Sequence, residues 1–315
     1  MTSPIRSKAR WGAAVAALAL LGSAVVPSAL ADEPLVSLSD PAIVDPTGLT
    51  RDSEHQLYWL VQPTAEPVTW VYAVGVDGAT KARVGFNAAC PGAAALAWYG
   101  SSLYVADIAD LTRSRESVTV YGLPVHSLEP EQQLPHSAWS LTYPDGPRDA
   151  AALMVDGDGR LAVVTTGPDP AIWQAPLPLD PSRPNQLTRL AEAPPGVTDA
   201  YQLSEDLIAL RSASQVYLID RHSFETVAQG PVETLGQTLS LSLDGTLLVV
   251  AGSGPRTPLA TLVPPSTMPG QETVEPLDQD QPVTSWWSGR AIMVVTLVGA
   301  GLLALGAGGL AFARR

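Results

Sequence analysis

The sequence predicts an all-β domain built from similar units that follow one another along the chain. Between Asp32 and about Val263, short apolar or alternating runs such as "QLYWLVQ", "SLYVADIA" and "TLLVVAG" are separated by Gly, Pro and Asp. Such runs are typical of strands joined by turns. No run keeps the 3.6-residue period of a helix over a useful length. The runs also recur in order, with four strands in most units.

The repeated units predict how the strands are arranged. They span residues 47–86, 93–143, 150–193, 198–229 and 237–263. Repeats of about 40 residues with four strands each are typical of the blades of a β-propeller. The last unit lacks a fourth strand, and we expect the segment Pro34–Ser37 ("PLVS") to supply it and close the ring. Five blades are favoured, six is the alternative count, and a two-sheet sandwich is the alternative fold.

The first 31 residues have the features of a secretory signal peptide. Arg6, Lys8 and Arg10 precede an apolar run over residues 11–26, and Ala29-Leu30-Ala31 offers a small-residue cleavage site. We therefore expect cleavage after Ala31 and export of the domain over residues 32–263.

The C-terminal part of the sequence predicts a membrane anchor. Residues 264–289 are polar and rich in Pro, as in a stalk. Residues 290–313 are the predicted transmembrane helix: after Arg290, residues 291–313 form an apolar run long enough to span a bilayer, and no LPxTG-like sorting motif precedes it. Arg314 and Arg315 follow as a cytoplasmic tail, in agreement with the positive-inside tendency. The predicted location is the cell membrane, with a single pass and an extracellular domain.

Charge and cysteine content exclude some classes of partner. The segment 32–289 has 12 basic and 31 acidic residues, a net charge of −19. Such a surface disfavours nucleic acids and anionic lipids, which are bound through Lys and Arg. Cys90 is the only cysteine, so the domain has no internal disulfide, and we expect its thiol to be buried and inert.

Several motifs together resemble a known family. They are "DPTGLT" at 45–50, "LYVADIAD" at 103–110, "YPDGPRDAAAL" at 143–153 and "LSLDGTLLVVAGS" at 241–253. In this order and spacing the sequence resembles secreted bacterial β-propellers, frequent in actinobacteria, that are related to phytase-like or esterase-like propeller domains. The resemblance covers residues 40 to about 262.

The sequence departs from that family at its acidic positions. Family members carry acidic residues in the opening strands of several blades, where this sequence has Ala94, Ala151 and Gln237. Since opening strands line the central channel, the family pattern implies a ring of carboxylates that can hold a hard cation or supply a general acid and base. Replacement by Ala removes both the charge and the metal ligand.

Four remaining aspartates define the candidate metal site. Asp107, Asp110, Asp145 and Asp149 lie in loops that we expect at one face, and calcium takes six to eight oxygen ligands. The alternative interpretation is that each Asp bonds the backbone of its own turn. The four histidines are isolated, so no transition-metal site is predicted. The sequence predicts no cofactor, with calcium at the four aspartates as the alternative.

Two functions follow from these observations. The favoured one is a non-catalytic binding module on the bacterial surface, anchored in the membrane, whose partner is an extracellular protein or glycan. The alternative is a calcium-dependent hydrolase of the phytase-like or esterase-like kind that uses the four aspartates. The absence of acidic side chains at Ala94 and Ala151 favours the binding module.

Overall fold

The computed structural model describes residues 33–266, apart from 234–235 and 255. The predicted signal peptide (1–31), membrane helix (290–313) and tail (314–315) lie outside these residues, as does most of the predicted stalk (264–289). Within the described part there is no helix that is both long and apolar enough to cross a bilayer. Regular structure there consists entirely of strands, which confirms the all-β prediction.

Twenty-two strands form five separate sheets. In chain order they are β1 (Glu33–Ser37), β2 (Gly48–Asp52), β3 (Leu57–Val61), β4 (Thr69–Val74), β5 (Thr80–Phe86), β6 (Ala93–Tyr99), β7 (Ser102–Asp107), β8 (Val118–Pro124), β9 (Glu131–Gln133), β10 (Ser137–Thr142), β11 (Ala150–Val155), β12 (Leu161–Thr165), β13 (Ala171–Gln174), β14 (Asn185–Gln186), β15 (Thr188–Glu192), β16 (Val197–Gln202), β17 (Leu207–Ser212), β18 (Gln215–Asp220), β19 (Thr226–Pro231), β20 (Ser240–Leu241), β21 (Leu248–Ala251) and β22 (Pro258–Leu262).

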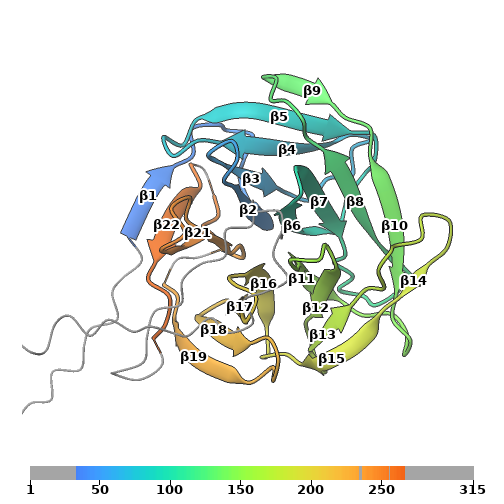
Figure 1. Ribbon diagram of the computed structural model, residues 1–315. Helices are drawn as coiled ribbons and strands as arrows, with labels where there is room; N and C mark the ends of the chain where they lie inside the picture. Colours follow the sequence, from blue (N-terminus) through green and yellow to red (C-terminus); the bar gives the residue numbers. More distant parts are fainter. Residues whose placement is uncertain (1–32, 234–235, 255, 267–315) are drawn as a thin grey trace, which may run out of the picture.

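Each sheet is one blade of a ring around a central axis (Figure 1). Blade 1 contains β2, β3, β4 and β5; blade 2 contains β6, β7, β8 and β10; blade 3 contains β11, β12, β13 and β15; blade 4 contains β16–β19; blade 5 contains β20, β21, β22 and β1. The chain is therefore a five-bladed β-propeller. Both the six-blade count and the two-sheet sandwich are excluded by this pairing.

The N-terminal strand completes the last blade, as the sequence predicts. β1 pairs antiparallel with β22, with Glu33 opposite Thr261 and Ser37 opposite Pro258. The side chain of Val36 packs against the cluster of buried residues between blades 5 and 1. Since β1 precedes blade 1 and belongs to blade 5, this pairing joins the two ends of the ring.

The opening strands β2, β6, β11, β16 and β20 surround the axis, each in contact with the opening strands of its two neighbours. Three of them contain a β-bulge, at Ala94, Ala151 and Thr198. Ala94 is buried within the apolar cluster between blades 2 and 3. Two of the positions where the family resemblance expects acidic residues thus coincide with bulges that carry a methyl group.

Apolar side chains fill the space between neighbouring blades. Trp59 lies in the cluster between blades 1 and 2, and Trp173 in that between blades 2 and 3, both almost fully buried. Cys90 is fully buried in the first cluster, and burial raises the pKa of its thiol to about 11. The expectation of a buried thiol is confirmed, and the raised pKa keeps it protonated at neutral pH.

Two short strands extend blades 1 and 2 in a way that the sequence does not predict. β9 pairs in parallel with β5, and β14 pairs in parallel with β10. Both come from a connection within the following blade, so blade 2 adds a strand to blade 1, and blade 3 adds one to blade 2. Arg83 on β5 also forms an ion pair with Glu131 on β9. These additions cover strand edges that would otherwise be open.

Candidate functional site

The four predicted aspartates lie where blades 2 and 3 meet. Asp107 ends β7, Asp110 lies in the β7–β8 connection, and Asp145 and Asp149 lie in the β10–β11 connection. Because antiparallel strands alternate in direction, these two connections are on the same face of the ring. The predicted gathering at one face is therefore present, and the contacts of each carboxylate show what it does there.

Asp107 is buried and bonded on both oxygens. Its Oδ1 accepts a hydrogen bond of 2.7 Å from the backbone amide of Gly92. Its Oδ2 accepts one of 2.6 Å from Nη2 of Arg115, whose Nη1 also donates to the carbonyl oxygen of Ala109. The Asp107 carboxylate thus fastens the β5–β6 connection and the β7–β8 connection to the end of β7.

Asp110 and Asp149 are buried and joined through the backbone. Oδ1 of Asp149 accepts a hydrogen bond of 2.8 Å from the amide of Asp110, and Oδ2 of Asp110 accepts one of 2.7 Å from the amide of Arg115. Burial raises the pKa of Asp110, but hydrogen bonds from the amides of Arg115 and Ser114 outweigh it and lower the pKa below its usual value. Asp110 is thereby held as a carboxylate.

Asp145 has a different environment from the other three. It is about half exposed and forms an ion pair with Arg148, whose Nε donates to Oδ1 over 3.0 Å and whose Nη2 contacts Oδ2. Hydrogen bonding from Arg148 lowers the pKa of Asp145. Among the residues that the structure describes, no three His, Cys, Asp or Glu side chains are arranged to hold a metal ion. The calcium site stays a prediction.

Beside Asp145 lies a hollow of about 210 Å³, which we call the blade 2–3 hollow. Its lining comes from the β7–β8 connection of blade 2, the β10–β11 connection between the blades and the β12–β13 turn of blade 3. The lining residues are Arg113, Asp145, Pro147, Arg148, Thr166, Pro168 and Asp169. Asp145, Pro147 and Arg148 belong to the "YPDGPRDAAAL" motif of the sequence. The other lining residues reach them only because the closed ring brings blades 2 and 3 together.

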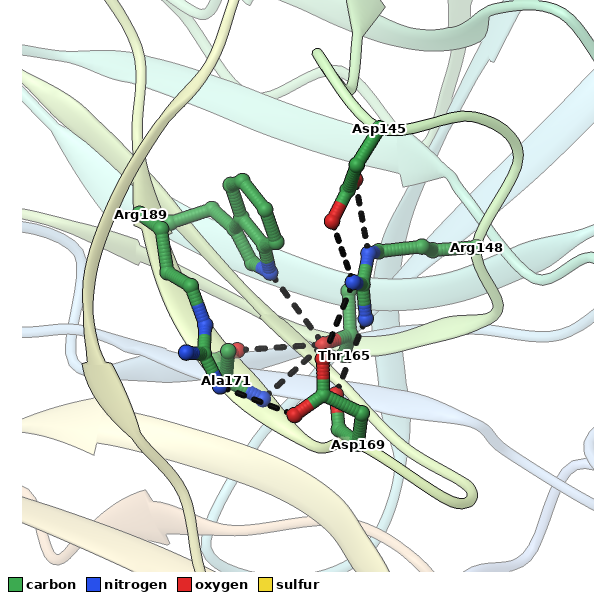
Figure 2. Close-up of polar contacts among 7 residues, drawn as sticks. Asp145, Arg148, Thr165, Asp169, Ala171 and Arg189 are labelled. Carbon is green, nitrogen blue, oxygen red and sulfur yellow. Dashed lines mark hydrogen bonds and ion pairs between the residues drawn. The ribbon is translucent and has the colours of Figure 1, made fainter.

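Arg148 forms ion pairs with carboxylates on both sides, Asp145 and Asp169 (Figure 2). Besides pairing with Asp145, its Nη1 donates to the carbonyl oxygen of Asp169 over 2.9 Å, and its Nη2 donates to Oδ2 of Asp169 over 3.0 Å. Its guanidinium also lies over the ring of Trp173, 5.0 Å from the centroid. The hydrogen bonds to Asp145 and Asp169 raise the pKa of Arg148, so it stays charged.

Asp169 is paired through both carboxylate oxygens, and the strand end behind it is hydrogen-bonded. Oδ1 of Asp169 accepts from Nη2 of Arg189 over 2.9 Å, so both of its oxygens face a guanidinium. Close to it, Oγ1 of the fully buried Thr165 accepts from the amide of Ala171 over 3.0 Å and from Nε1 of Trp173 over 3.2 Å (Figure 2). This wall of the hollow is therefore held together by hydrogen bonds and ion pairs within the protein.

Arg113 differs from the other charged residues of the hollow. It is exposed, and its backbone has φ of 50°, in the left-handed region. Its amide donates to the carbonyl oxygen of Asp110 over 2.8 Å, which closes a turn. Within the described ranges, no carboxylate forms an ion pair with its guanidinium.

Gly167 makes the position of the Arg113 side chain possible. Gly167 has φ of 97°, and a Cβ added to it would overlap Nη2 of Arg113. The guanidinium therefore lies directly against the Gly167 backbone. Arg113, Thr166 and Asp169 have no motif in the sequence that marks them, and only the "TGPDP" turn at 166–170 indicates a loop there.

No protein-family model matches this sequence, and no curated protein matches it at a significant level. Among solved structures, similar ones include the WD40 repeats of RRP9, at 14% identity and TM-score 0.39, over 70% of this chain and 67% of that one. Another is a putative 6-phosphogluconolactonase from Bacteroides uniformis, at 15% identity and TM-score 0.40, over 72% and 69%. A third is the PQQ-bound aldose sugar dehydrogenase from Streptomyces coelicolor, at 10% identity and TM-score 0.42, over 73% and 96%. At these values none of them assigns an activity to this chain.

Proposed function

We propose that the chain is a non-catalytic binding module, a propeller whose blade 2–3 hollow receives an extracellular glycan or protein ligand. The observation that carries this proposal is the preformed hollow, whose wall is fixed by the Asp145–Arg148–Asp169–Arg189 series of ion pairs. A site that is ordered before binding avoids the entropy cost of ordering side chains on contact. Concave, largely preformed sites are typical of small-ligand recognition.

The contacts of the aspartates favour binding over hydrolysis. A calcium-dependent hydrolase needs carboxylate oxygens that are free to coordinate the ion. Here Asp107 accepts from Gly92 and Arg115, and Asp149 accepts from the amide of Asp110. These oxygens hold connections of the protein together, and calcium would have to displace Arg115 from Asp107.

The proposed location of the module rests on the sequence. The predicted signal peptide at 1–31 and the apolar run at 291–313 support an exported domain anchored by a single helix, with residues 264–289 as a stalk. The motif resemblance supports descent from secreted phytase-like or esterase-like propellers that lost acidic residues at Ala94 and Ala151.

The test uses residues 32–289, which contain every strand of the closed ring. The fragment is applied to immobilised neutral and acidic oligosaccharides and peptides, and binding is measured by interferometry. Pro168→Trp places a large side chain in the hollow, whereas Pro181→Trp alters an exposed proline of the β13–β15 connection, outside the lining. We expect a ligand that binds the unchanged fragment and Pro181→Trp but not Pro168→Trp. Ligands that bind all three alike, or calcium-dependent phosphoester hydrolysis, would contradict the proposal.

A further inference from the structure

We infer that the blade 2–3 hollow recognises a carboxylate on a small ligand, with the guanidinium of Arg113 as the principal donor. This inference rests on the proposed function of the hollow and specifies the chemistry of its ligand. Its basis is the contrast between Arg113 and the other charged residues of the lining, which neutralise one another.

The pairing of charges leaves one positive group available. Arg148 is shared between Asp145 and Asp169, and Asp169 is also paired with Arg189. Arg113 lines the same hollow, is exposed, and forms no ion pair with any described carboxylate. An incoming anion therefore does not have to break an existing ion pair to reach it.

The backbone of Arg113 has a defined conformation, and its guanidinium lies against the opposite turn. Its left-handed backbone and the hydrogen bond from its amide to Asp110 fix the turn that carries it. Gly167 then lets the guanidinium lie against the backbone of the opposite turn. A side chain at 167 would force the guanidinium to move, so this close approach of Arg113 to the opposite turn depends on Gly167.

Thr166 supplies a second donor beside Arg113. It lines the hollow, is half-buried, and its backbone amide is fixed by a hydrogen bond of 2.9 Å to the carbonyl oxygen of Asp149. Its hydroxyl has no protein partner among the described residues. A planar guanidinium together with a hydroxyl suits a carboxylate, because the two parallel N–H groups match its two oxygens.

Size and charge restrict the ligand further. Pockets for drug-sized ligands are roughly 300–1,000 Å³, so a hollow of about 210 Å³ suits a single small unit. Asp145 and Asp169 remain close by, and the segment 32–289 as a whole carries a net charge of −19. This favours one negative charge over a phosphate dianion or a polyanion. A sugar acid unit of otherwise neutral character, such as a hexuronate, fits these conditions.

The test measures amide chemical shifts of the ¹⁵N-labelled fragment 32–289 during titration with four probes. Glucuronate is the sugar acid, glucose is its neutral counterpart, N-acetylalanine presents a single carboxylate without a sugar, and inorganic phosphate presents another anion. We expect saturable shifts around Arg113 and Thr166 with glucuronate, an affinity for glucose at least ~10-fold lower, and weakening by added salt. A response to N-acetylalanine equal to that with glucuronate would show that the site recognises the carboxylate and not the sugar ring.

Three variants assign the effect to Arg113. Arg113→Gln removes the charge, Arg113→Lys keeps the charge without the planar fork, and Arg183→Gln changes an exposed arginine of the β13–β15 connection. We expect affinity for glucuronate to fall ~10-fold or more in Arg113→Gln, about 1.4 kcal/mol, to fall less in Arg113→Lys, and to stay unchanged in Arg183→Gln. Thermal melting checks that each variant is folded.

The outcomes separate this inference from the proposed function. Equal binding of glucose and glucuronate that Arg113→Gln does not weaken would overturn the carboxylate inference and leave the hollow as a glycan site. Tighter binding of phosphate would overturn the choice of a carboxylate. The absence of shifts with all four probes would overturn the inference, whereas the Pro168→Trp comparison would still decide whether the hollow binds another ligand.

Discussion

The backbone amide of Asp110 donates a hydrogen bond of 2.8 Å to Oδ1 of Asp149, although 39 residues separate them. This bond joins the β7–β8 connection of blade 2 to the residue that directly precedes the opening strand of blade 3. Both residues are buried. The charged Pro/Gly turn at 143–149 therefore forms a junction between blades, and its exposed part, Asp145 and Arg148, borders the hollow.

Removing the Asp149 carboxylate should destabilise this junction. In Asp149→Ala the buried amide of Asp110 loses its acceptor, and an unsatisfied buried donor costs about 1–3 kcal/mol. We expect a loss of that size in the free energy of unfolding, measured by urea denaturation. Asp158→Ala, at an exposed turn, is the control and should change it by less than ~0.5 kcal/mol. Equal stability of both variants would show that the junction does not depend on this bond.

Deletion of Glu33–Ser37 should open the ring. The deletion exposes the edge of β22 and removes several backbone hydrogen bonds at about 1 kcal/mol each. We expect the melting temperature to fall by roughly 10 °C and the protein to self-associate through the free edge. Calorimetry and size-exclusion chromatography measure the two effects.

A substitution in the same strand provides the control for that deletion. Ser37→Asp changes an exposed side chain but keeps the backbone pairing with β22, so it should remain monomeric and melt close to the unchanged protein. A deletion variant that melts like Ser37→Asp would contradict closure of the ring by β1.

Gly122 on β8 leaves space for an aromatic ring. A Cβ added at Gly122 would lie 2.7 Å from the ring of Trp139 on β10, so Gly122→Ala must displace the indole. Overpacking of this kind costs about 1–3 kcal/mol. Gly157→Ala is the control, since nothing lies within 4 Å of its added Cβ. Urea denaturation should show the loss only in Gly122→Ala, and an indole with room to move would instead give equal stabilities.

Tyr58 should make the fold sensitive to alkaline pH. Burial raises the pKa of Tyr58 to about 12, although the amide of Leu243 donates a hydrogen bond to its hydroxyl oxygen and lowers it. A raised pKa stabilises the folded state fully below pH 10, and this contribution is lost as the pH rises from 10 through 12. It amounts to about 3 kcal/mol at most.

The measurement is urea denaturation at several pH values between 9 and 12. We expect stability to fall across this range, and the slope to be shallower in Tyr58→Phe, which has no phenol to ionise. An unchanged slope in Tyr58→Phe would show that other groups account for the alkaline loss.

The blades could be predicted from the sequence because each strand and turn is marked by residues next to one another in the chain. Alternating runs and turn residues such as Asp77-Gly78 and Asp244-Gly245 mark strand ends, so the five predicted units agree with the blades to within a few residues. The closing role of Pro34–Ser37 followed from a missing strand. In contrast, β9 and β14 contain three and two residues, and they pair only because another blade offers an open edge.

The hollow was not predictable for a different reason. Arg113, Arg148 and Asp169 come from three separate connections of two blades. Arg148 lies in the "YPDGPRDAAAL" motif, but nothing in the sequence brings Arg113 and Asp169 to it. The four aspartates were recognisable as a group at one face, but their partners were not. Whether Asp107 faces a metal or the guanidinium of Arg115 depends on where a loop eight residues away returns.

The most direct test of whether these aspartates serve the fold or a cation is calorimetric titration of calcium into the fragment 32–289, with its melting temperature followed in parallel. Our account predicts no saturable heat and no change in melting temperature, because the carboxylates of Asp107, Asp110 and Asp149 are bonded to protein N–H groups. Saturable binding that raises the melting temperature and disappears in both Asp107→Asn and the half-exposed Asp145→Asn would contradict it and favour the calcium-dependent hydrolase.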